Sequence, residues 1–166
     1  MQRTTFTNRT PLPNTLSEEA VLRILHDHAA MIEQNPLVIH YERISTPDDA
    51  PEDERDGAWY ELTDRISYLP CGLLQGKLNY RGYLHDTPQG LRTHIYAPLG
   101  VHIHDYWTVH RRKIFAGETG PPSVFYLQEE VELICPFITT SFVRRTLSQS
   151  HSELVARLVA AGGGSA

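Results

Sequence analysis

Hydrophobic and polar residues alternate with a period of two along most of the middle of the chain. This pattern predicts strands, because side chains two residues apart in a strand share a face. Glycine and proline residues occupy the short connections, which is typical of an antiparallel meander. The expected strands are residues 37–45, 57–69, 77–87, 90–98, 100–110 and 123–134.

The regions on either side of this meander have other patterns. A threonine-rich alternating segment at residues 4–10 predicts one more strand, which two prolines end. Ser17 then precedes apolar residues at helical spacing, so we expect a capped helix, or a helix broken in two, as far as Asn35. Helical spacing returns at residues 137–161, where a long helix should close the chain.

This order of elements resembles the helix-grip fold of the START and birch-pollen-allergen-like superfamily, also called SRPBCC. The resemblance covers residues 2–161 and includes the segments NPLVIHYERI, PPSVFYLQEEVEL and CPFITT. Within the superfamily, the sequence is similar to a fungal branch. It implies an α+β fold in which a curved antiparallel sheet of about seven strands wraps around the C-terminal helix and encloses an apolar cavity. Members include lipid carriers, hormone receptors and polyketide cyclases, so the fold alone does not choose a function.

Composition narrows the class of protein. With 40% hydrophobic and 21% charged residues among 166, the chain should form one domain over residues 1–161, with 162–166 as a flexible tail. A net charge of −5 argues against nucleic acid as a partner. Because the sequence has neither a bilayer-length apolar run nor a signal peptide, we expect a cytoplasmic protein without a membrane span. We expect it to be a monomer or a homodimer. Cys71 and Cys135 lack the spacing of a metal knuckle or disulfide framework.

The alternating pattern also predicts which side chains face the helix. In residues 100–110 the apolar set shares one face, which should line the concave side, while the histidines should face solvent. Sorting three strands in this way turns the following residues inward: Tyr60, Leu62, Asp64, Ile66, Tyr68, Val101, Ile103, Asp105, Trp107, Val109, Phe125, Leu127, Glu129, Val131 and Leu133.

Three carboxylic acids interrupt these inward rows, namely Asp64, Asp105 and Glu129. A buried carboxylate is costly, so each acid either has a structural partner or has a raised pKa that lets it move protons near neutral pH. Asp105 is the leading candidate, since Trp107 on the same face can stack on a ligand ring. His151 lies on the sheet-facing stripe of the last helix, either as a packed residue or as a general base.

These groups define the predicted site. Its catalytic residues are Asp105, His151 and Glu129, and we expect substrate contacts from Trp107, Tyr60, Tyr68, Tyr80, Phe142, Ile103 and Leu127. Aromatic and aliphatic side chains of this kind shape an apolar pocket, and phenols can orient a ligand oxygen.

His102 and His104 have the spacing of half a metal site. On a solvated face they would need a third ligand, which His94 on the preceding strand can supply. Cupins bind a metal with an H-x-H pair that has a glycine well upstream and a glutamate a few residues downstream. Here Gly100 is too close to His102, and Glu118 is too far from His104, so the cupin pattern is not matched. The sequence therefore predicts no metal site and no cofactor.

No nucleophile elbow, phosphate-binding loop, dinucleotide fingerprint or HExxH motif occurs, so hydrolase, kinase and dehydrogenase activities have no support. The resemblance and the inward acids favour a cofactor-independent enzyme of natural-product metabolism. It would cyclise, isomerise (by a pericyclic, Diels–Alder-type step among others) or dehydrate an apolar polyketide- or terpenoid-like substrate. One alternative is a non-catalytic carrier or receptor of lipids or small hydrophobic metabolites. Another is a partner-binding module using the acidic segment 48–56, which is otherwise a solvated loop.

Overall fold

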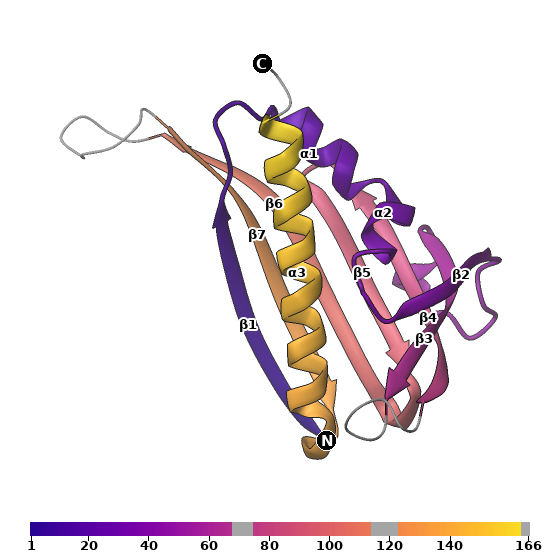
Figure 1. Cartoon of the computed structure of the whole chain (residues 1–166). Coiled ribbons are helices and arrows are strands. Elements are labelled where there is room, and N and C mark those ends of the chain that lie inside the picture. The colour runs from indigo at the N-terminus through magenta and orange to yellow at the C-terminus, as the bar shows by residue number, and fades with distance from the viewer. Residues whose placement is uncertain (68–74, 114–122, 164–166) are drawn as a thin grey trace.

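A long helix crosses one side of an antiparallel sheet in the computed structural model, which describes residues 1–67, 75–113 and 123–163 (Figure 1). The strands are β1 (Gln2–Pro11), β2 (Val38–Ile44), β3 (Ala58–Ser67), β4 (Gln75–Thr87), β5 (Gly90–Ala97), β6 (Val101–Lys113) and β7 (Ser123–Cys135). Their order in the sheet is β1-β7-β6-β5-β4-β3-β2. The helices are α1 (Glu18–Leu25), α2 (His28–Ile32) and α3 (Thr140–Gly163), with short turns η1 (Glu52–Glu54), η3 (Pro98–Gly100) and η4 (Phe137–Thr139). The predicted α+β helix-grip fold is confirmed.

The helical insert after β1 is divided in two, one of the two predicted forms. Ser17 caps α1 by accepting a hydrogen bond from the backbone N–H of Ala20 at 3.1 Å. Asp27 caps α2 in the same way, with its Oδ1 3.0 Å from the N–H of Ala30. A second capping residue within the segment starts a new helix, which explains the break.

Gly90 is required where the β4–β5 hairpin meets β6. A Cβ atom at this position would lie 1.7 Å from the carbonyl oxygen of Trp107. Glycine therefore permits the close approach of the two strands. The resulting register places Leu91 opposite Trp107 on the helix-facing side.

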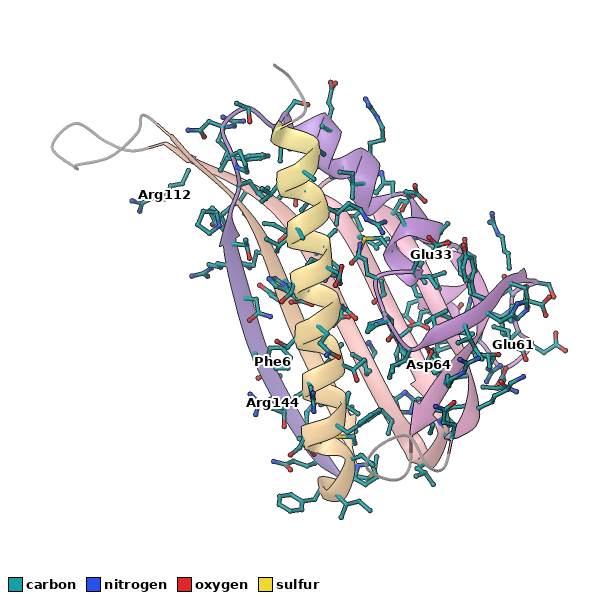
Figure 2. The ribbon with its side chains drawn as sticks, in the orientation of Figure 1. Phe6, Glu33, Glu61, Asp64, Arg112 and Arg144 are labelled. Carbon is teal, nitrogen blue, oxygen red and sulfur yellow. The ribbon has the colours of Figure 1, made fainter. Side chains whose placement is uncertain are left out.

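The core lies between the inner face of the sheet and the three helices. Leu154 and Leu158 of α3 are fully buried in a cluster with Leu127, Phe125 and their neighbours. At the other end of α3, the guanidinium carbon of Arg144 lies 5.7 Å from the centre of the Phe6 ring of β1 (Figure 2). The strand pairings and burial confirm the predicted sorting of the described residues in β3, β6 and β7.

The outer face of the sheet carries a second apolar cluster, which corrects one expectation. Ala50, Trp59 and Tyr83 are buried there, with Trp59 2% exposed, so this part of the convex side does not face solvent. Residues 45–57, which include the acidic segment, fold over this face. Asp49 and Asp53 of this segment pair with arginines of β4 and β5. The segment covers the sheet through the buried Ala50 and Glu54, while its other acids stay exposed, as expected from their charge.

α3 extends past the predicted domain limit at residue 161. It continues to Gly163, and the hydroxyl of Thr15 donates a hydrogen bond to the carbonyl oxygen of Gly162 at 3.1 Å. Neither α3 nor another helix among the described residues combines the length and the apolar character needed to cross a bilayer.

Candidate functional site

The three inward acids have different surroundings, and Asp64 is the one with a structural role. It accepts hydrogen bonds from the hydroxyl of Tyr80 at 2.8 Å and from Nδ2 of Asn35 at 3.2 Å. Burial raises the pKa of Asp64, and the two donors act in the opposite direction. Burial and the neighbouring Asp64 also raise the pKa of Tyr80. Figure 2 shows Asp64 on the β3 side of the sheet, across α3 from Phe6.

Glu129 joins β7, β1 and α3. Its side chain is 2% exposed, and its Oε2 lies 2.7 Å from Nδ1 of His151. The same oxygen accepts a hydrogen bond from Nδ2 of Asn8, also at 2.7 Å. The other ring nitrogen of His151 lies 3.0 Å from the hydroxyl oxygen of Thr10. Two predicted catalytic residues are thus brought into direct contact, and two β1 residues complete the network.

Asp105 is the inward acid without such partners. Its Oδ1 is buried and has no hydrogen-bond partner among the described residues, although the residue as a whole keeps some accessible surface. Burial, and secondly the charge of Glu129, raise the pKa of Asp105 well above its usual range. The structure therefore favours a neutral carboxylic acid beside the Glu129–His151 pair.

Trp107 covers this pair from the sheet. Its ring stacks on the imidazole of His151, with ring centres 5.6 Å apart and planes 18° from parallel. Trp107 and the neighbouring Leu127 are both buried in the main core. The indole therefore fixes the orientation of His151 from the side opposite to solvent.

The other predicted substrate contacts are distributed unevenly. Tyr60 is buried, Tyr80 is bound to Asp64, and Ile103 is half-buried on the inner face. Phe142 is 50% exposed, whereas Val143 of the same turn packs on the sheet, so Phe142 does not form the expected wall. Tyr68 lies outside the described residues.

The inward side chains of the sheet are not equally buried. Beside α1 and the C-terminal half of α3, the inward side chains of β5, β6 and β7 are buried. Towards the start of α3, Ile95, Ile103 and Leu78 of β4 keep part of their surface accessible, whereas a second set of inward residues is buried with Val143 of α3 packed against it, namely Val101, Leu133 and Cys135. Asp105 lies two residues from Ile103 on the same face of β6 and is itself half-buried.

A further hydrogen-bonded group links α2 to the sheet. His28 has its Nδ1 3.0 Å from the hydroxyl of Tyr60 and its Nε2 3.0 Å from Oδ1 of Asp86. Sequence reasoning placed His28 among the apolar positions of the helix and did not foresee this group. The available signal was a histidine on an otherwise apolar helix face.

The histidines of β5 and β6 correct the expectation that they face solvent. His94 is 6% exposed, and His102 and His104 are half-buried, because residues 45–57 cover them. One donor atom each of Glu54, His94 and His104 lies within 4.8 Å of the others, a spacing that can hold a metal ion. Glu54 was missed because it lies within an acidic run, although Trp59 on the outward face indicated that something covers it.

The fold places the chain in the helix-grip class, and solved structures of that class align over nearly its whole length. Ara h 8.0201 matches with 8% identity and a TM-score of 0.58, covering 96% of this chain and 99% of that one. A START superfamily protein from Mycobacterium smegmatis matches with 14% identity and a TM-score of 0.53, covering 94% and 96%. The Zhui aromatase/cyclase from Streptomyces sp. R1128 matches with 10% identity and a TM-score of 0.51, covering 98% and 93%.

The sequence itself assigns the family. Residues 1–162 match the family described as a domain of unknown function (DUF7053), and the chain belongs to it. A comparison with curated proteins gave no match. At these levels of identity the structural matches establish the fold, while the fungal branch stays a prediction.

Proposed function

We propose that the chain is an enzyme that cyclises, isomerises or dehydrates an apolar, polyketide- or terpenoid-like molecule on the inner face of the sheet, without a cofactor at that face. The observation that carries this proposal is the buried Oδ1 of Asp105, which lacks a hydrogen-bond partner among the described residues. A neutral acid in an apolar setting can donate its proton to a substrate carbonyl oxygen. A cytoplasmic location and a monomeric or dimeric state belong to the same proposal.

The Glu129–His151 pair supplies the complementary base. As a carboxylate, Glu129 accepts the Nδ1–H of His151, which leaves Nε2 as the basic nitrogen. Thr10 now donates its hydroxyl to that nitrogen, so its side chain has to turn away before Nε2 can accept a proton. Removal of a proton next to a carbonyl by His151, with proton donation to the oxygen by Asp105, gives an enol without any external reagent. An enol of this kind is a common step of isomerisation and ring closure.

The apolar surroundings support a hydrophobic substrate. The half-buried aliphatic side chains beside Asp105 favour contact with hydrocarbon more than with a charged metabolite. Among the structural matches, the Zhui protein is described as an aromatase/cyclase. A shared fold hosts several functions, so this match adds support only together with the site.

A second candidate function, a non-catalytic carrier, is favoured by the hydrogen bonding of the base. Asn8, Thr10, Glu129 and His151 satisfy one another, which is what a purely structural network also does. In a carrier the pair would serve to join α3 to β1 and β7.

The two functions differ in what Asp105→Asn does. Strains of the source organism with the wild-type gene, the Asp105→Asn gene and a deletion are compared by untargeted mass spectrometry of their extracts. Native mass spectrometry of each purified protein reports any co-purified metabolite. An enzyme should keep its bound metabolite in the Asp105→Asn variant, while the strain loses a product and accumulates its precursor. Extracts identical to wild type for Asp105→Asn and for His151→Gln would support the carrier. Asp48→Asn, an exposed acid, is the matched control.

A further inference from the structure

Three metal-binding side chains converge on the outer face of the sheet, where η1 crosses β5 and β6. The side chains of Glu54 and His94 are 3% and 7% exposed, and Oε1 of Glu54 lies 2.8 Å from Nδ1 of His94. His104 brings a third donor atom within 4.8 Å of both. We propose that these three residues bind a divalent first-row transition-metal ion such as Zn²⁺. This site is separate from the proposed enzyme site, and it departs from the sequence-based expectation of no metal.

The register of the sheet and a fixed turn bring the three donors together. His94 and His104 face each other directly in the β5–β6 pairing, and their rings stack with centres 3.6 Å apart. The indole N–H of Trp59 donates to the carbonyl oxygen of Glu54 at 2.9 Å. This bond holds η1 against the sheet, so the carboxylate is positioned without any metal.

Groups around the donors orient them as in a metal site. The hydroxyl of Tyr96 donates to Oε2 of Glu54, which leaves Oε1 on the side of His94. Nε2 of His94 lies 3.0 Å from Nδ1 of His102. A histidine that binds a metal through one nitrogen usually donates its other N–H to a nearby acceptor, and His102 provides that acceptor.

The donor set selects the kind of ion. Two imidazoles and one carboxylate suit zinc, iron(II) or cobalt(II), whereas magnesium and calcium prefer oxygen ligands alone. With bonds of about 2.0–2.2 Å, tetrahedral ligands lie roughly 3.4 Å apart. Oε1 of Glu54 and Nδ1 of His94, now 2.8 Å apart, therefore have to separate slightly, while the donor atom of His104 has to move towards them. His104 can make this movement, because its ring has no hydrogen bond within the described part of the chain to break. Three protein ligands leave one position for water.

The charge near the cluster is compatible with a cation. Nη2 of Arg92 lies 3.8 Å from Oε1 of Glu54, beyond hydrogen-bond distance. The same nitrogen lies 3.1 Å from Oδ2 of Asp53, which balances its charge. Glu54 therefore keeps a lone pair and a negative charge for an ion, and a bound ion would fasten η1 to β5 and β6.

The first test uses the wild-type chain, stripped with a chelator and titrated with cobalt(II) chloride. We expect saturable binding of one equivalent, visible absorption bands of cobalt(II) with nitrogen and oxygen ligands, and a higher melting temperature when zinc chloride is added, since a ligand of the native state alone stabilises it. Absence of saturable cobalt binding overturns the proposal.

Variants assign the ligands. Glu54→Gln and His104→Gln should each weaken cobalt binding by about 100-fold or more. His102→Ala should weaken it by about 10–100-fold, because the variant loses the group that accepts the other N–H of His94. His110→Gln is the matched control, because His110 lies on the same face of β6 but stacks on Tyr126 outside the cluster. Unchanged affinity in His104→Gln, or an equal loss in His110→Gln, contradicts the assignment. If Glu54→Gln does not fold, His104→Gln decides the question.

Discussion

Asp105 and Glu129 are neighbouring inward acids, yet they are held in opposite ways. Glu129 is bound by a histidine and an asparagine, whereas Oδ1 of Asp105 has no partner in the described part of the chain. The difference arises because the polar groups of Asn8 and His151 meet Glu129 on β7, whereas His151 meets β6 only through the stacking of its ring on Trp107. In the proposed site this difference assigns the roles of the two groups: the unpartnered Asp105 is the proton donor, and Glu129 orients His151 as the base.

The raised pKa of Asp105 makes folding depend on pH. Burial raises this pKa in the folded protein above that of the unfolded chain, so folding takes up a proton between the two values and stability falls as pH rises through that window. Below the unfolded value of about 3.9 both states are protonated and the cost is absent. Asp105→Asn cannot ionise. Its free energy of unfolding, relative to wild type, should therefore rise from about pH 5 to about pH 8 in urea unfolding. Parallel profiles for the two proteins would show that Asp105 is not desolvated.

Removing His151 leaves a buried carboxylate with fewer partners. We expect His151→Ala to lower the free energy of unfolding by about 2–4 kcal/mol, because Glu129 then keeps only its bond to Asn8. The double variant Glu129→Gln with His151→Ala should recover part of this loss in a double-mutant cycle. His110→Ala, on the outer face, serves as control. Additive effects of the two substitutions would mean that the pair is not coupled.

At the scale of elements, α3 has two unlike halves. Leu154 and Leu158 are fully buried, while residues 140–150 contain no buried side chain. The C-terminal half therefore anchors the helix, while the N-terminal half contacts the sheet through the partly buried Val143.

This asymmetry predicts different costs of truncation along one helix. Leu154→Ala should lower the free energy of unfolding by about 2–5 kcal/mol, as is usual for a buried leucine. Phe142→Ala should cost less than about 1 kcal/mol, since half of its surface is already exposed. Chemical denaturation of both variants checks this. Similar losses would mean that the start of α3 packs as tightly as its end.

At the scale of the whole molecule, the sheet separates two sites. The acid–base group faces α3, and the proposed metal ligands lie on the outer face under residues 45–57. Because the two groups share no side-chain contact, their free energies should be nearly additive. Each proposal can then fail without the other.

This separation is tested by crossing the variants. His151→Ala should leave the cobalt affinity within about twofold of wild type, as expected for sites without shared partners. Glu54→Gln should in turn leave any co-purified apolar metabolite in place, as seen by native mass spectrometry. A large change in either experiment would show that the two faces are coupled through the sheet.

The order of the elements and the direction of the strand side chains were determined by the sequence alone, because period-two and helical spacing are local properties. Local patterns thus predicted Asp105, Glu129 and His151 as inward groups. The contact between Glu129 and His151, the lack of a partner at Asp105, and the folding of Glu54 onto His94 depend on segments far apart in the chain. They were decided only by the tertiary structure, since packing between distant elements determines which polar groups meet once water is excluded.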